Sequence, residues 1–232
     1  MIEEPKKLTI KSPDRRPTDA QIAAFQGVPT GFVVDAMYGT GALAPEVSWV
    51  GAGQGAAPHV AGPALTVDNR PSDILALLAA LYFIRKGDVV VNAFAGCEGC
   101  AAAGDRVSGM MKNCGAAGFV TDGPMRDLSG IMAVGLPSWC TGLNPNSPFG
   151  TGPGKVGLPV NIAGQRVETG DMIVADADGV VVVPFAQVAA VSARIAEVAA
   201  LEHALDAEVD AGLSVPDDIK EVIQSDDVTW IR

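Results

Sequence analysis

The stretch GFVTDGPMRD, residues 118–127, joins a predicted buried strand to a charged segment. Its first four residues, GFVT, form a short apolar run of the kind found in the strands of a covered sheet. Asp122-Gly123 then predicts a turn, and Arg126 and Asp127 follow it. An arginine can clamp a small carboxylate, and an aspartate can hold a hard divalent cation. We therefore expect this strand to end at a binding site.

A second carboxylate, that of Asp105, precedes this pair in the sequence. Twenty residues separate Asp105 from Arg126, and Asp105 directly precedes a predicted helix. A carboxylate in that position could order a water molecule or move a proton, although it could also simply cap the helix. Together, the guanidinium and the two carboxylates suggest metal-assisted chemistry on a small oxoacid.

Working outward from this stretch, short apolar runs alternate with turns and helical segments. We predict strands at residues 63–68, 89–92, 118–121, 136–141, 158–162, 165–168, 172–175 and 180–183. We predict helices at residues 19–25, 30–37, 74–85, 106–113 and 185–211. Thr18 is the predicted N-cap of the first helix, and Pro184 opens the last one. Mixed strands between helices predict a layered α/β architecture.

The chain shows no internal repeat and no linker that would divide it. We expect an N-terminal arm at residues 1–17, one α/β domain at residues 18–232, and a short acidic tail after the long helix. Residues 38–62 have little periodicity and predict a loop with short strands.

Composition excludes several classes of protein. The 232 residues carry a net charge of −11, which disfavours binding to nucleic-acid phosphates. The charged N-terminus does not resemble a secretory signal, and the most apolar stretch, residues 74–84, is too short to span a bilayer. The four cysteines have no disulfide-rich pattern, so we expect reduced thiols and a cytoplasmic location.

Three other motifs lack what their chemistry needs. Cys97 and Cys100 form a CxxC pair, but no second pair or spaced histidines complete a zinc site. The segment GTGPGK, residues 150–155, misses the first glycine of a phosphate loop, and Val156 replaces the required Ser or Thr. His59 and His203 have no nearby nucleophile and predict structural or exposed roles.

Five segments carry a resemblance to a known family. They are GDVVV (87–91), AAGD (102–105), GFVTDGPMRD (118–127), TGPGKVGLPV (151–160) and TGDMIVADADGVVVVP (169–184). In this order they resemble the ribonuclease E activity regulator A-like proteins. The Asp, twenty residues, Arg-Asp pattern is similar to the branch of class II 4-hydroxy-4-methyl-2-oxoglutarate/4-carboxy-4-hydroxy-2-oxoadipate aldolases. The resemblance implies an α/β/β/α sandwich with mixed sheets.

The resemblance also implies a reaction. A 4-hydroxy-2-oxoacid would be cleaved to pyruvate and a second oxoacid through a pyruvate enolate that Mg²⁺ or Mn²⁺ stabilises, with oxaloacetate decarboxylation as a second activity. Asp127 would be the metal ligand, and Arg126 would bind the pyruvyl carboxylate. Asp105 would hold a metal-bound water. Backbone N–H groups of Arg106 and Val107 would cradle the carboxylate.

The last implied residue comes from another subunit. Glu202 on the C-terminal helix best matches a glutamate that orients metal-bound water in trans, although Leu201 and His203 depart from the usual basic flanks. A homotrimer or dimer of trimers follows from this role. The loop at residues 97–100 also departs from the family pattern, which leaves the substrate open. The alternative function is a non-catalytic regulator that binds a ribonuclease or another protein.

Overall fold

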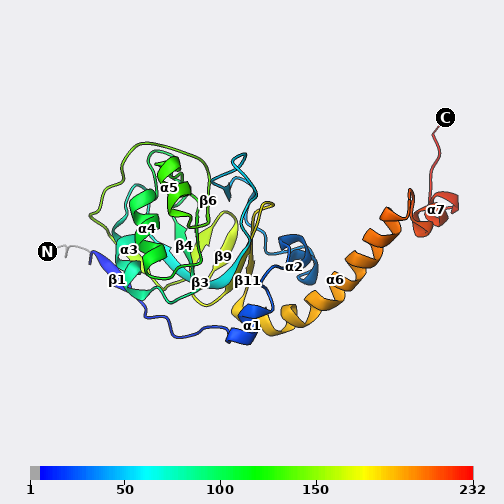
Figure 1. Cartoon of the computed structure of the whole chain (residues 1–232), viewed down its shortest axis with the longest axis horizontal. Coiled ribbons are helices and arrows are strands. Elements are labelled where there is room, and N and C mark those ends of the chain that lie inside the picture. Colours follow the sequence, from blue (N-terminus) through cyan, green and yellow to red (C-terminus); the bar gives the residue numbers. More distant parts are fainter. Residues whose placement is uncertain (1–5, 232) are drawn as a thin grey trace. The chain divides into compact units, whose positions relative to one another are not determined.

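Four parallel strands form the centre of the fold: β3 (Val60–Asp68), β4 (Val89–Ala93), β5 (Gly118–Thr121) and β6 (Ser138–Cys140). The computed structural model describes residues 6–231. Nearly every residue of these strands is buried, as is typical of parallel strands covered on both faces. Three crossover helices join them in turn and lie together against the sheet (Figure 1): α3 (Leu75–Ala80), α4 (Asp105–Asn113) and α5 (Leu128–Val134).

Antiparallel and edge strands complete a mixed sheet. The strand β2 (Ser48–Trp49) pairs antiparallel with β6 at one edge. At the other edge β7 (Gly154–Val156) pairs antiparallel with β3, and β1 (Leu8–Ile10) pairs parallel with β7. Because β3, β4, β5 and β6 are parallel, the carboxyl ends of these four strands lie along the same side of the sheet.

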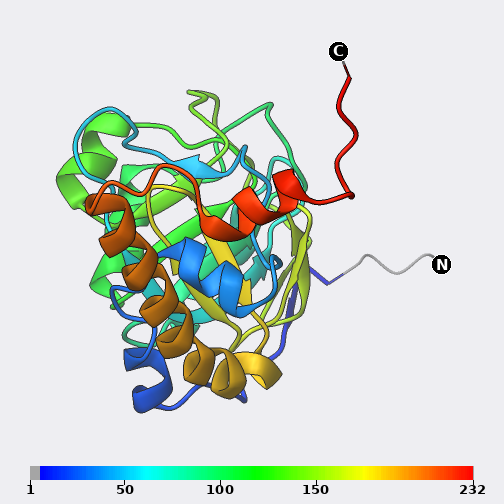
Figure 2. The same cartoon turned by 90° about the vertical axis from the view of Figure 1, so that its right-hand side faces the viewer.

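A second β layer covers the other face of this sheet. The start of β3 pairs with β10 (Met172–Ala175), which pairs in turn with β11 (Val180–Val183). A separate hairpin joins β8 (Val160–Ile162) to β9 (Gln165–Val167). The helix α2 (Thr30–Ala36) contacts β10 and β11 and lies outside this layer (Figure 2). The predicted α/β fold, layered with mixed sheets, is confirmed.

Strand periodicity divides the hydrophobic core into two clusters. In β4, Val90 faces the helices α3–α5, whereas Val89 and Val91 face the second β layer. Successive side chains of a strand point to opposite faces, so one valine run supplies both cores. Burying each such side chain stabilises the fold by about 1.5–3 kcal/mol. The central sheet is thereby held from both sides, which fixes the strand ends.

Most predicted elements are confirmed, but several were missed. Thr18 caps α1 (Asp19–Ala23) through a capping box with Gln21. The helix α5 was not predicted. It has seven residues with Gly130 among them, and no side-chain cap bond marks its start. The strands β1 and β7, of three residues each, were also missed, whereas β2 lies within residues 38–62, where short strands were expected. β1 follows the charged N-terminus and β7 lies in a Pro- and Gly-rich crossing, so neither stands out as an apolar run.

The chain forms two compact units, Met1–Ile195 and Ala196–Arg232, and the predicted domain at residues 18–232 spans both. The predicted long C-terminal helix is α6 (Val188–Asp210), which follows the 3₁₀ turn η2 (Phe185–Gln187). Another 3₁₀ turn, η1 (Leu81–Phe83), follows α3. The predicted acidic tail contains a further helix, α7 (Asp217–Gln224). Among residues 6–231, no helix has the length and apolar character needed to cross a bilayer.

Candidate active site

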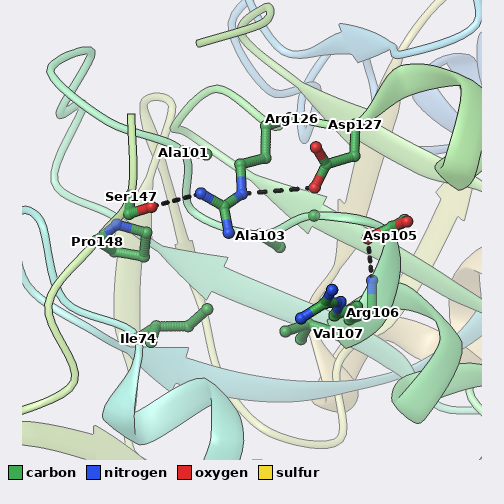
Figure 3. Close-up of a pocket in the computed structure, with 11 residues that line it drawn as sticks. Ile74, Ala101, Ala103, Asp105, Arg106, Val107, Arg126, Asp127, Ser147 and Pro148 are labelled. Carbon is green, nitrogen blue, oxygen red and sulfur yellow. Dashed lines mark hydrogen bonds and ion pairs between the residues drawn. The ribbon is translucent and has the colours of Figure 1, made fainter. Parts of the chain in front are cut away.

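A cavity of about 570 Å³ opens at the carboxyl ends of β4 and β5, where α4 and α5 begin (Figure 3). Open α/β sheets place ligands at this edge, because helix N-termini and strand-end loops converge there. The residues that line it all belong to the first unit: Ile74, Ala101, Ala103, Gly104, Asp105, Arg106, Val107, Arg126, Asp127, Ser147 and Pro148. Five of the six predicted site residues are therefore brought together.

The loops that follow β4 and β5 run side by side, which explains how residues twenty positions apart meet. Ala102 N–H donates to Pro124 O at 2.7 Å, and Arg126 N–H donates to Ala103 O at 3.1 Å. Ala103 and Met125 form an isolated parallel bridge. These bonds extend the parallel pairing beyond the strands and bring the start of α4 next to the Arg126-Asp127 pair.

Arg126 is held on two sides of its guanidinium. Nη1 donates to Ser147 Oγ at 2.5 Å, and Nε lies 3.5 Å from Asp127 Oδ2 (Figure 3). The side chains of Arg126 and Asp127 are 36% and 47% exposed, so both remain accessible from the cavity. A planar guanidinium oriented in this way is suited to bind a carboxylate through parallel hydrogen bonds.

Asp127 has an unusual backbone for a non-glycine residue. Its φ of 64° and ψ of 46° lie in the left-handed region, a conformation that costs on the order of 1–3 kcal/mol at such sites. It precedes α5 but makes no side-chain capping bond to that helix. Its carboxylate instead lies at the cavity beside Arg126 (Figure 3). Strain of this kind, retained at a cavity, points to a functional role.

Asp105 is the first residue of α4 and packs against α5. A Cβ atom built on Gly130 would lie only 2.4 Å from Asp105 Oδ2, so the absence of a side chain there makes room for the carboxylate. Asp105 Oδ1 accepts a hydrogen bond from Arg106 N–H at 2.6 Å. The Arg106 N–H, one of the two backbone donors predicted to bind the substrate carboxylate, thus already donates to Asp105. The Val107 N–H belongs to the first turn, whose donors lack partners inside the helix.

The donor set fits a cation that is bound by few protein groups. Asp127 and Asp105 supply carboxylate oxygens at one cavity. No cluster of three or more His, Cys, Asp or Glu residues able to hold a metal occurs between residues 6 and 231. Magnesium commonly binds one or two carboxylates and keeps several waters, so this sparse set of oxygen ligands suits it better than zinc.

Glu202 is the predicted site residue that the cavity does not include. It lies on α6, in the unit Ala196–Arg232, and its side chain is half-buried. Its role in a neighbouring subunit stays a prediction.

Six residues of the cavity were not predicted as site residues from the sequence. They come from three separate segments: Ile74, Ala101, Ala103, Gly104, Ser147 and Pro148. Ser147 and Pro148 lie in the Pro- and Gly-rich crossing at residues 144–157, where no spacing identifies a ligand. Asn144 and Asn146 join this crossing to the loop at residues 97–100, donating to Glu98 O at 2.7 Å and Gly99 O at 3.0 Å.

Asp122, which the sequence predicts only as a turn residue, positions the loop before α4. Its buried carboxylate accepts hydrogen bonds from Phe94 N–H at 2.5 Å and Gly96 N–H at 3.0 Å. Burial raises the pKa of Asp122, and these two N–H groups oppose that shift. The carboxylate therefore connects the end of β5 to the loop that leaves β4.

Comparison with known proteins identifies relatives over most of the chain. The family model described as Aldolase/RraA, of the RraA-like family, matches residues 30–182. A protein of Halalkalibacterium halodurans, named as a proposed 4-hydroxy-4-methyl-2-oxoglutarate aldolase, is 38% identical over 166 residues, covering 72% of this chain and 77% of the relative.

Two solved structures share the fold. One is Streptomyces coelicolor RraAS2, described as an unusual member of the RNase ES inhibitor RraA protein family. It is 26% identical with a TM-score of 0.70, over 84% of this chain and 98% of that one. The other, an uncharacterized protein from Pseudomonas syringae, has a TM-score of 0.73 at 22% identity, over 87% of this chain and 97% of that one. The second likeness concerns the fold alone.

Proposed function

The chain belongs to the RraA-like family, and from this premise we propose that it is a divalent-metal-dependent lyase. It would cleave a 4-hydroxy-2-oxoacid, of the 4-hydroxy-4-methyl-2-oxoglutarate or 4-carboxy-4-hydroxy-2-oxoadipate type, to pyruvate and a second oxoacid. The observation that carries the proposal is the convergence of Asp105, Arg126 and Asp127 on one cavity. The name of the 38% identical relative supports the same reaction.

Arg126 and the start of α4 would bind the carboxylate of the pyruvyl half. Ser147 and Asp127 hold the guanidinium of Arg126 in place before a ligand arrives. The Val107 N–H lies at a helix N-terminus, where the helix dipole favours an anion. The Arg106 N–H would join it if Asp105 moves its carboxylate from that donor to a water molecule. Arg126 and the Val107 N–H would form the preorganised part of this set, which stabilises charge without reorganising during the reaction.

The proposed cleavage is a retro-aldol step. The bond between C3 and C4 breaks, the 4-hydroxyl loses its proton, and C4 becomes the carbonyl carbon of the second oxoacid. The bonding electron pair passes to the pyruvyl half as an enolate, which becomes pyruvate when C3 takes up a proton. Asp105 would accept the hydroxyl proton through an ordered water, and Arg126 would offset the developing negative charge.

Asp127 would hold the divalent cation, with Asp105 facing the same space. Bound there, Mg²⁺ or Mn²⁺ would supply Lewis-acid polarisation of the 2-oxo group. Decarboxylation of oxaloacetate also yields pyruvate through its enolate, so the same residues would support it. We further propose a homotrimer or a dimer of trimers in which Glu202 reaches the site of a neighbouring subunit and orients water.

The test couples pyruvate release to lactate dehydrogenase, with and without Mg²⁺ after chelation. Arg126→Ala and Asp127→Ala should each reduce turnover by at least about 100-fold, as expected when a charge-stabilising donor is removed. Gly109→Ala, on the same helix as Asp105, is the control, because its added Cβ would make only an ordinary contact with Val134 at 3.8 Å. Undiminished turnover in both charged-residue variants would refute the lyase.

A second candidate is a non-catalytic regulator of a ribonuclease. The likeness to RraAS2, described as a member of an RNase ES inhibitor family, favours it at 26% identity. This candidate predicts no pyruvate and no need for a divalent cation. The complete set of Asp105, Arg126 and Asp127 favours the lyase, since a protein that only binds a partner needs no such group at a cavity.

A further inference from the structure

The cavity contains a second guanidinium, that of Arg106. Its side chain lines the cavity and is exposed, and Figure 3 shows it near Val107 while the guanidinium of Arg126 lies nearer Ser147. The backbone N–H of Arg106 donates to Asp105, but its guanidinium makes no hydrogen bond or ion pair with any residue from 6 to 231. Arg126, by contrast, is held by two neighbours. Arg106 is therefore available to a ligand.

The cavity is larger than the pyruvyl half of a substrate requires. Its volume of about 570 Å³ lies within the range of pockets that enclose much larger organic ligands. The same cavity is also lined by the apolar side chains of Ile74, Ala103 and Pro148 (Figure 3). A ligand with an anionic group at each end and a short carbon chain between them matches this arrangement.

We propose that the side chain of Arg106 binds the distal carboxylate of the substrate, which C4 carries and the second oxoacid retains after cleavage. The inference rests on the proposed lyase function and deepens it. It makes Arg106 a specificity-determining residue that selects a 4-hydroxy-2-oxoacid with two carboxylates over one that ends in a neutral group. The second product is then an oxoacid and not a neutral aldehyde or ketone.

The physical basis is the pairing of guanidinium with carboxylate. Arginine presents donors in a planar fork that matches a carboxylate, and a hydrogen bond to a charged group contributes enough to change binding by about tenfold or more. Arg106 lies at the start of α4, so its backbone borders the proposed pyruvyl end while its side chain lines the same cavity. A neutral substrate end gains nothing from this residue.

The experiment compares two substrates that differ at one group. One is 4-hydroxy-4-methyl-2-oxoglutarate, and the other is 4-hydroxy-4-methyl-2-oxopentanoate, in which a methyl group replaces the distal carboxylate. Arg106→Gln should lower kcat/KM for the first substrate by about tenfold or more and leave that for the second within about twofold. Arg106→Lys, which keeps the charge, should recover part of the loss.

Lys86→Gln is the matched control, because it removes one exposed cation that precedes β4 at the opposite edge of the sheet. It should leave both substrates unaffected. If Arg106→Gln lowers kcat/KM equally for both substrates, or for neither, the inference is overturned. The proposed lyase function stands in that case as long as the wild-type protein forms pyruvate. Wild-type protein that forms no pyruvate from either substrate would overturn the proposed function and the inference together.

Discussion

Gly104 lies directly against Asp127, so that a Cβ atom at Gly104 would stand 2.7 Å from Asp127 Oδ2. The same atom would lie 3.1 Å from Arg126 Cγ. Gly104 has a φ of −139°, a conformation open to any residue, so the need for glycine here comes from this close approach and not from the backbone. The residue before Asp105 thus makes room for the pair that follows β5.

Gly104→Ala should therefore impair the site while the protein stays folded. The added methyl group would push the Asp127 carboxylate and the Arg126 side chain away from their positions. A displacement of about 1 Å in a catalytic group can lower the rate by about 100-fold, and we expect a loss of kcat/KM of that order. Pyruvate release and thermal unfolding should be measured together, with Gly109→Ala as the control. Full activity in Gly104→Ala would show that this contact is dispensable.

Gly130→Ala should act on the other carboxylate. Alanine is favoured over glycine in a helix by about 1 kcal/mol, so the substitution should not weaken α5 through helix propensity. Its Cβ would nevertheless meet Asp105 Oδ2 at 2.4 Å and displace it. We expect kcat to fall to about the level of Asp105→Ala. In the double variant Gly130→Ala/Asp105→Ala the two losses should not add, whereas additive losses would indicate that Gly130 acts by another route.

Asp73→Asn should destabilise the wall of the cavity in a pH-dependent way. Burial alone would raise the pKa of Asp73, but N–H groups of Leu75, Thr151 and Gly152 together hold it below its ordinary value of 3.8. A carboxyl group with a lowered pKa stabilises the fold above the pKa of the unfolded chain and loses that effect as the pH falls.

The loss of stability in Asp73→Asn should accordingly be about 1–3 kcal/mol at pH 7 and should shrink below about pH 4. Denaturant unfolding of the variant and wild type at several pH values measures it. A difference that stays constant down to pH 3 would contradict the assigned ionised state.

Arg16→Ala should destabilise the fold because it leaves a buried carboxylate without its partner. Asp88 is buried, Arg16 Nη1 bonds to it, and Arg16 Nη2 also donates to Lys86 O at 2.8 Å. Burial raises the pKa of Asp88, while the N–H of Arg85 and the charge of Arg16 oppose that rise. Removing one partner of a buried pair costs about 3 kcal/mol.

Without Arg16, the pKa of Asp88 should rise further. When the pKa of a carboxyl group is higher in the folded than in the unfolded protein, the group favours the folded state at pH values below its pKa in the unfolded chain. This contribution to stability is lost as the pH rises through its pKa in the folded protein. The penalty in Arg16→Ala should therefore grow from acid to neutral pH, and Arg16→Ala/Asp88→Asn should recover part of it. A penalty that is largest at acid pH would contradict this assignment.

The elements that sequence patterns predicted are those with a local cause. The valine run of β4 and the Thr18 capping box are visible in the chain because a few adjacent residues determine them. The helix α5 was missed because its start depends on the left-handed backbone of Asp127, which no sequence pattern specifies. Its position is set by packing on α4 and the sheet.

The candidate site divides in the same way. Asp105, Arg126 and Asp127 could be predicted because their spacing follows from one strand–helix–strand unit. Ser147 and Pro148 could not, since they reach the cavity on a long crossing held by Asn144 and Asn146. Gly104 and Gly130 matter only for the room they leave, which becomes visible once their neighbours are placed.

The most direct test of the lyase counts product against substrate. With Mg²⁺ present, 4-hydroxy-4-methyl-2-oxoglutarate should be cleaved between C3 and C4 to two pyruvate molecules, and ¹H NMR should record about two pyruvates formed for each substrate consumed. The same sample with Asp127→Asn should retain its substrate. Substrate that remains unchanged with the wild-type protein, or equal cleavage by Asp127→Asn, would contradict the proposed function of this site.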